Sequence, residues 1–135
     1  MPTRVLIADD SPSVRNAVRK ILQKQLNVDV CAMAENGLDA IEKAKALRPD
    51  VIVLDLKMPG ISGVEVAGIL MKELPHARTI LFTLYAETIS GSTASVLGMP
   101  VISKTDGLGK LVETVRSFLA SATKRRSLLS DSGAA

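Results

Sequence analysis

One stretch of the chain, Val51–Gly63, constrains the fold more than any other, and it reads VIVLDLKMPGISG. Its leading apolar residues do not alternate with polar ones, which is typical of a strand buried on both faces of a parallel sheet. The pair Pro59-Gly60 ends the strand, because proline lacks a backbone donor and glycine opens the backbone angles. Asp55 therefore lies where a buried strand meets a loop, at the sheet edge where open α/β folds place their chemistry. A carboxylate that only caps a strand end is the alternative interpretation of Asp55 on this stretch alone.

Apolar runs and helical stripes alternate along the rest of the chain. The apolar runs predict further strands at Arg4–Ala8, Val28–Ala34, Thr79–Leu84 and Val101–Ser103. Apolar residues at helical spacing predict helices after Ser11, over Leu38–Leu47, after Gly63, over Glu87–Leu97 and over Leu108–Leu119. This alternation predicts a doubly wound (βα)5 α/β fold of the flavodoxin-like type, with a five-stranded parallel sheet in the order 2-1-3-4-5 and helices on both faces.

The composition is that of one soluble globular domain. The chain has 135 residues, of which 47% are hydrophobic and 23% charged. Its single cysteine, Cys31, lies in an apolar run and cannot form an internal disulfide, which favours a buried thiol in a reducing compartment. No apolar stretch reaches the ~20 residues of a membrane span, and the N-terminus has no signal-peptide pattern. We therefore expect a cytoplasmic protein with no membrane contact.

The end of the chain differs from its body. Lys124, Arg125 and Arg126 form a short basic cluster without interleaved aromatic residues, which favours a solvated helix end over a nucleic-acid patch. The residues that follow are rich in serine and alanine. We expect a folded domain over residues 1–123, a disordered tail over 124–135, no output domain in the chain and no direct DNA binding.

Polar residues lie at or just after the ends of four of the predicted strands and would meet at one edge of the sheet. These residues are Asp9 and Asp10, Asp55, Thr83, and Lys104. Converging carboxylates raise one another's pKa unless a cation lies among them, and oxygen ligands of this kind suit Mg²⁺. Aspartate carboxylates act as nucleophiles that form aspartyl-phosphates, and phosphoryl transfer needs mainly positioning and charge neutralisation. Each of these residues taken singly could be structural: the paired acids as loop residues before a helix, Thr83 as a buried strand residue and Lys104 as an exposed loop lysine. Their coincidence at one edge of the sheet favours a functional site.

The residues of this edge resemble the receiver domain of two-component response regulators, and the resemblance extends from Arg4 to Leu119. It is carried by the residues Asp9-Asp10, Asp55 through Gly60, Gly63, Thr83 and Lys104. The resemblance implies that Asp55 is the phosphoacceptor for a histidine kinase or a histidine phosphotransfer protein. It also implies that Thr83 and Lys104 bind and neutralise the phosphoryl oxygens.

The same resemblance implies a metal site and a signalling role. Mg²⁺, with Mn²⁺ as a substitute, would be held by Asp10, Asp55 and the backbone carbonyl of Lys57, while Asp9 would hold a metal-bound water. The chain would be no enzyme with an independent substrate. Phosphorylation would switch the surface of the fourth helix, fifth strand and fifth helix, through which a downstream protein or a second copy of the chain would bind.

Two positions depart from the family pattern. The place three residues before the lysine usually carries Tyr or Phe as part of the activation switch, whereas here it is Val101. The place after the lysine often carries a proline in cis, whereas here it is Thr105. Because a cis bond without proline costs about 3–4 kcal/mol, we expect either a trans bond with a rearranged loop or a strained cis bond.

Alternative functions remain open on the sequence. A haloacid-dehalogenase-type phosphatase would place its nucleophile after the first strand in an Asp-x-Asp-x-Thr motif, which this chain lacks. A flavin carrier would need an acid-free phosphate loop and more aromatic residues than Phe82, Tyr85 and Phe118. The strongest alternatives are a degenerate receiver that only binds proteins, and the N-terminal fragment of a DNA-binding transcriptional regulator.

Overall fold

The computed structural model describes residues 2–84, 86 and 98–133 of the chain, with the backbone alone described from residue 122 onward. From Thr3 to Thr83, strands and helices alternate along it as the sequence predicts. The elements are β1 (Thr3–Ala8), α1 (Pro12–Gln25), β2 (Val28–Ala34), α2 (Gly37–Leu47), β3 (Val51–Leu54), α3 (Gly63–Glu73), β4 (Arg78–Thr83), β5 (Val101–Ser103), the short 3₁₀ helix η2 (Lys104–Asp106) and α5 (Leu108–Gly133). The predicted fourth helix, Glu87–Leu97, lies outside the described residues.

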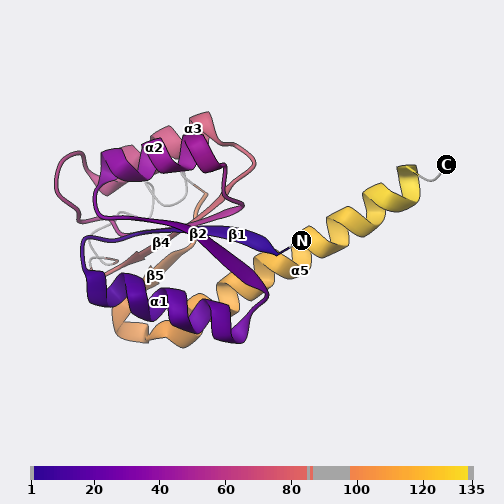
Figure 1. Ribbon diagram of the computed structural model, residues 1–135, viewed down its shortest axis with the longest axis horizontal. Coiled ribbons are helices and arrows are strands. Elements are labelled where there is room, and N and C mark those ends of the chain that lie inside the picture. The colour runs from indigo at the N-terminus through magenta and orange to yellow at the C-terminus, as the bar shows by residue number, and fades with distance from the viewer. Residues whose placement is uncertain (1, 85, 87–97, 134–135) are drawn as a thin grey trace.

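The strands form one five-stranded parallel sheet in the order β2-β1-β3-β4-β5. This confirms the predicted fold class and strand order. Figure 1 shows α2 and α3 on one face of the sheet and α1 and α5 on the other. Because every strand runs in the same direction, all the strand ends that carry polar residues lie at one edge of the sheet.

Each face of the sheet has its own hydrophobic core, because successive side chains of a strand point to opposite faces. Leu6 and Ala8 of β1 pack toward α2 and α3, whereas Val5 and Ile7 pack toward α1 and α5. All four are at most 1% exposed. Burial on both faces explains the unbroken apolar runs of the sequence.

Three helices begin at a side-chain cap just past the edge of the sheet formed by the carboxyl ends of the strands. Ser11, Asn36 and Ser62 each accept a hydrogen bond from a backbone N–H of the first turn of α1, α2 and α3, at 3.3, 2.8 and 3.2 Å. The proline after Ser11 occupies the first helical position, as the sequence predicts. These caps fix where each loop at the edge ends.

The last helix is longer than the sequence pattern led us to expect. The sequence analysis expects a disordered tail over residues 124–135, and the structure continues the backbone of α5 as a helix to Gly133. No proline or glycine occurs from Lys110 to Ser132, so nothing in the sequence ends the helix earlier. In Figure 1 the yellow end of α5 runs past the edge of the sheet. Among the described helices, α5 included, none is both long and apolar enough to cross a membrane.

Candidate functional site

Acidic side chains from two strand ends meet at the carboxyl edge of the sheet. Asp9 and Asp10 directly follow β1, and Asp55 directly follows β3, the neighbouring strand. Each offers one carboxylate oxygen, and these oxygens all lie within 4.8 Å of one another. Asp9 and Asp55 are only 2% and 5% exposed, whereas Asp10 is exposed. This acidic cluster, Asp9, Asp10 and Asp55, is consistent with a Mg²⁺ site, because hard divalent cations take oxygen ligands.

Lys104 supplies a positive charge to this cluster from the end of the outermost strand, β5. It follows β5, and its Nζ lies 2.6 Å from Asp9 Oδ2 and 3.3 Å from Asp55 Oδ2. The sequence predicted that Lys104 would reach the acids, but not that Asp9 would be the nearer partner. The same ammonium lies 6.0 Å from the centroid of the Phe82 ring of β4. Lys104 therefore bridges two buried carboxylates that come from different strands.

Burial and charge shift the pKa values of two groups of this site in the same direction. The pKa of Asp55 is raised because burial disfavours the carboxylate and because Asp9 lies beside it. Lys104 and the backbone N–H of Lys57 oppose that rise without cancelling it. Burial alone would lower the pKa of Lys104, but its hydrogen bond to Asp9 and the charges of Asp55 and Asp9 outweigh burial and raise it. The cluster thus holds more negative charge than one ammonium neutralises.

The raised pKa of Asp55 predicts a pH dependence of stability in metal-free solution. The folded state binds the proton of the Asp55 carboxyl more tightly than the unfolded state does. The resulting stabilisation of the folded state is therefore fully present below the pKa of Asp55 in the unfolded chain, which is about 4. It is lost as the pH rises through the folded pKa. The unfolding free energy of wild type minus that of Asp55→Asn should therefore fall between acid and neutral pH, measured by urea denaturation in a chelator. A difference in unfolding free energy that stays constant or rises with pH would contradict the raised pKa of Asp55.

Asp9 is held in place by contacts that the sequence did not reveal. Its Oδ1 accepts a hydrogen bond from the backbone N–H of Ser11 at 2.9 Å, and its carbonyl oxygen accepts one from Arg15 Nη1 at 2.7 Å. Its own N–H donates to the carbonyl of Ala34 in β2 at 3.0 Å. The only sequence signal for Arg15 is its position one helical turn after the cap Ser11, which places both residues on the same side of α1. Arg15 anchors the backbone of the acidic loop.

The loop between β3 and α3 is shaped by two glycines. Gly60 has a φ of 92°, a conformation that glycine adopts without steric cost. Gly63 lies so close to the backbone of Leu56 that a Cβ there would come within 2.3 Å of the Leu56 Cα. Its N–H donates to the Leu56 carbonyl at 3.1 Å. Within this loop, the exposed Lys57 donates its backbone N–H to Asp55 Oδ1 at 3.4 Å.

Thr83, the remaining predicted site residue, also lies at this edge. Thr83 is the last residue of β4 and is fully buried. Val101, at the place of the family's switch aromatic, pairs with Leu81 of β4. The described residues contain no cis peptide bond, so the bond between Lys104 and Thr105 is trans. Of the two backbone conformations expected there, the trans bond is the one present.

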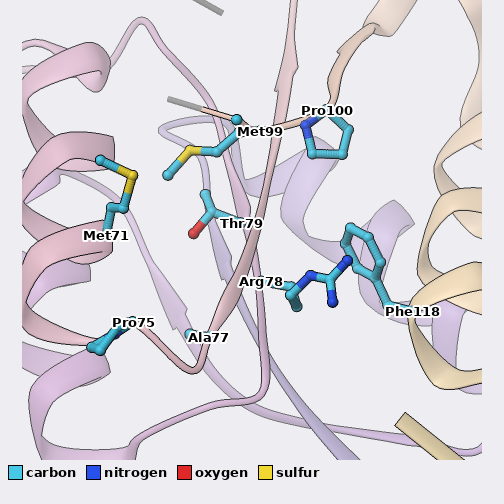
Figure 2. Close-up of a pocket in the computed structure, with 9 residues that line it drawn as sticks. Met71, Pro75, Ala77, Arg78, Thr79, Met99, Pro100 and Phe118 are labelled. Atoms are coloured by element: carbon cyan, nitrogen blue, oxygen red, sulfur yellow. The ribbon is translucent and has the colours of Figure 1, made fainter. Parts of the chain in front are cut away.

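A pocket of about 200 Å³ lies elsewhere, at the opposite end of β4. It is lined by Met71, Pro75, Ala77, Arg78, Thr79, Gly98, Met99, Pro100 and Phe118. In Figure 2 the guanidinium of Arg78 lies over the ring of Phe118, with its central carbon 4.4 Å from the ring centroid. Arg78 and Thr79 begin β4, whereas Thr83 ends it at the acidic cluster. This pocket is therefore separate from the candidate site.

Comparisons with known proteins agree with this geometry. A family model described as the response regulator receiver domain matches residues 5–116. Response regulator protein VraR of Staphylococcus saprophyticus is 36% identical over 117 residues, which cover 86% of this chain and 56% of that protein. The solved response regulator domain of Thermotoga maritima CheB has a TM-score of 0.76 at 30% identity, over 87% of this chain and 96% of that one. The response regulator TrrA of Thermotoga maritima, solved in complex with Mg(2+)-BeF, has a TM-score of 0.74 at 34% identity, over 85% and 97% of the two chains.

The chain spans little more than half the length of VraR. The family match, by contrast, begins at Val5 within β1 and ends at Arg116 within α5. It includes every residue of the acidic cluster and Lys104. The parallel sheet order and this match together show that the chain belongs to the response regulator receiver domain family of two-component signalling.

Proposed function

We propose that Asp55 accepts a phosphoryl group from a histidine kinase or a histidine phosphotransfer protein. The observation that supports this most is the position of Asp55, which is buried within 4.8 Å of two other carboxylates and 3.3 Å from the ammonium of Lys104. A carboxylate in such a place is oriented and is flanked by groups that handle phosphoryl charge. Membership of the receiver family supports the same role.

In the proposed reaction, a carboxylate oxygen of Asp55 attacks the phosphorus of a phosphohistidine. An oxygen–phosphorus bond forms, the nitrogen–phosphorus bond of the donor breaks, and its electron pair returns to the donor imidazole. Lys104 would pair with the transferred phosphoryl oxygens, as it now pairs with Asp55. Thr83, at the end of the strand between β3 and β5, would donate its hydroxyl to them.

The metal ligands follow from the same residues. We infer that Asp10, Asp55 and the carbonyl of Lys57 hold Mg²⁺ or Mn²⁺, and that Asp9 orients a water on the ion. The oxygen donors of the acidic cluster fit this chemistry, and the similar protein TrrA was solved with Mg(2+)-BeF. The ion supplies neutralisation of the charge on the phosphoryl oxygens.

The signalling role beyond the phosphoryl group is part of the proposal. Phosphorylated Asp55 would change the surface formed by the fourth helix, β5 and α5, and a downstream protein or a second copy of the chain would bind there. The chain would turn over no independent substrate, would not bind DNA directly, and would work in the cytoplasm. A receiver that acts as a binding module without phosphorylation is the alternative, as is the N-terminal part of a DNA-binding regulator.

Mass measurement after incubation with acetyl phosphate tests the phosphoacceptor role. Wild type with Mg²⁺ should gain the mass of one phosphoryl group, and the adduct should be stable in acid and labile in base. Asp55→Ala should gain nothing, and removal of Mg²⁺ should suppress the gain in wild type. Wild type that stays unmodified with Mg²⁺, or Asp55→Ala that is modified equally, would contradict the proposal and favour the binding module.

Metal binding should be visible as a rise in stability. At a Mg²⁺ concentration a hundredfold above its Kd, the unfolding free energy should rise by about 2.7 kcal/mol. Asp10→Ala should lose most of this gain, and since Asp10 is exposed, its substitution should leave the metal-free fold intact. The matched control is Asp106→Ala, which removes an acid that is 51% exposed and lies outside the cluster. Equal Mg²⁺ stabilisation of Asp10→Ala and wild type, in thermal melts, would exclude Asp10 as a ligand.

A further inference from the structure

The turn that carries Lys104 is closed by two hydroxyl side chains. Ser103 Oγ and Thr105 Oγ1 lie 2.6 Å apart, and the backbone N–H of Thr105 donates to Ser103 Oγ at 3.2 Å. The two residues flank Lys104 directly, one as the last residue of β5 and the other inside η2. Both bonds therefore span the lysine.

The aim of Lys104 depends on this turn, because its ammonium works far from its backbone. In the sheet order, β5 is two strands from β3, so the lysine begins roughly 10 Å from the strand of Asp55. Its Nζ still lies 3.3 Å from Asp55 Oδ2 and 2.6 Å from Asp9 Oδ2. A small rotation of the backbone at Lys104 would move the ammonium by ångströms.

The contacts also explain how this backbone is held without a proline. A proline after the lysine would fix the backbone through its ring, but it has no N–H to donate. Thr105 has both an N–H and a hydroxyl, and both meet Ser103. Gly107 then ends the turn with a φ of 83° and donates its N–H to the carbonyl of Lys104 at 3.2 Å. The bond after Lys104 is trans.

We propose that Ser103 and Thr105 act as a hydroxyl clamp that positions Lys104 on the acidic cluster. They are positioning residues, because neither contacts Asp55 in the described hydrogen bonds and both act through the lysine between them. The inference about the reaction rate rests on the proposed phosphoryl transfer, whereas the inference about where Lys104 points does not.

The test compares phosphorylation rates with acetyl phosphate and Mg²⁺. Ser103→Ala removes the shared acceptor of the clamp and should slow phosphorylation about tenfold, within the up to hundredfold loss that a misplacement of one ångström can bring. Thr105→Val removes one hydroxyl and should slow it less, and Thr105→Ser should restore the wild-type rate. Thr114→Val is the matched control, because Thr114 donates its hydroxyl to the Lys110 carbonyl on the exposed side of α5. Its rate should equal that of wild type.

A double-mutant cycle separates positioning from general damage. If Ser103 acts through Lys104, Ser103→Ala should cost nothing further in a Lys104→Ala background. The urea midpoint of Ser103→Ala should stay near that of wild type, since both hydroxyls lie at the surface. Additive losses in the cycle would overturn the clamp.

An NMR measurement tests the clamp without any phosphoryl transfer. The side-chain signals of Lys104 should shift in Ser103→Ala and return toward wild type in Ser103→Thr. Unchanged Lys104 signals in Ser103→Ala would overturn the clamp, whether or not wild type is phosphorylated. If wild type takes up no phosphoryl group but the Lys104 signals shift as expected in Ser103→Ala, the proposed function is overturned and the clamp stands.

Discussion

Gly63→Ala is expected to destabilise the fold by about 3 kcal/mol, at the upper end of overpacking costs. A Cβ at this position would lie 2.3 Å from the Leu56 Cα, 2.6 Å from its carbonyl oxygen and 2.8 Å from its carbonyl carbon. All three are backbone atoms, so no rotation of a side chain relieves the overlap. The loop between β3 and α3 must shift instead, and this loop begins with Asp55. Urea denaturation gives the change in unfolding free energy.

The matched control for Gly63→Ala lies in the same helix. Gly68→Ala adds the same methyl group where no described atom lies within 4 Å of the new Cβ, apart from its chain neighbours and the surrounding backbone of its own helix. Alanine is the better helix former by about 1 kcal/mol, so this variant should be slightly more stable than wild type. The two substitutions should therefore change the unfolding free energy in opposite directions. Similar effects of the two would show that the close approach of Gly63 to Leu56 does not exist in solution.

Lys104→Met is expected to destabilise the metal-free protein by about 3 kcal/mol, as loss of one partner from a buried ion pair does. The side chain of Lys104 is 13% exposed, and those of its partners Asp9 and Asp55 are 3% and 6% exposed. Methionine retains most of the apolar stem but leaves the acidic cluster without its ammonium. Added Mg²⁺ should then stabilise the variant more than wild type, because a cation replaces the missing positive charge. Urea denaturation with a chelator and with Mg²⁺ measures both effects.

A second lysine provides the control for Lys104→Met. Lys110 pairs with Asp106 at 3.9 Å, but their side chains are 59% and 51% exposed. Lys110→Met should change stability by less than about 1 kcal/mol, and Mg²⁺ should affect it as it affects wild type. A Lys104→Met variant as stable as Lys110→Met would mean that the ammonium of Lys104 does not stabilise the buried carboxylates of the acidic cluster.

Periodicity in the sequence was enough to predict the fold. The unbroken apolar runs at β1 and β3 indicated strands covered on both faces, and the helical stripes between them required crossovers and hence a parallel sheet. The acids after β1 and β3 then had to meet at the carboxyl edge, and the oxygens of the acidic cluster do lie within 4.8 Å of one another. Strand direction follows from the alternation of strands and helices, and the order 2-1-3-4-5 is one of the common orders of doubly wound sheets, so neither required knowledge of distances.

Distances between the ends of side chains belong to the tertiary structure. The sequence alone did not show that Lys104 lies nearer to Asp9 than to Asp55, nor that Arg15 binds the carbonyl of Asp9. These contacts depend on how far each loop curls after its strand, and that is decided by packing among segments far apart in the sequence.

The sequence by itself determined the order of the elements, the edge of the sheet at which the chemistry lies, and the residue types gathered there. Only the tertiary structure decided that the bond after Lys104 is trans and that Ser103 and Thr105 meet around it. It also decided that Gly63 must lack a side chain because the backbone of Leu56 fills that space. The physical reason is the same in each case. Hydrophobic patterning acts along a segment and determines whether that segment forms a helix or a strand. Steric exclusion and hydrogen bonding act between segments and determine which loop and side-chain conformations are adopted.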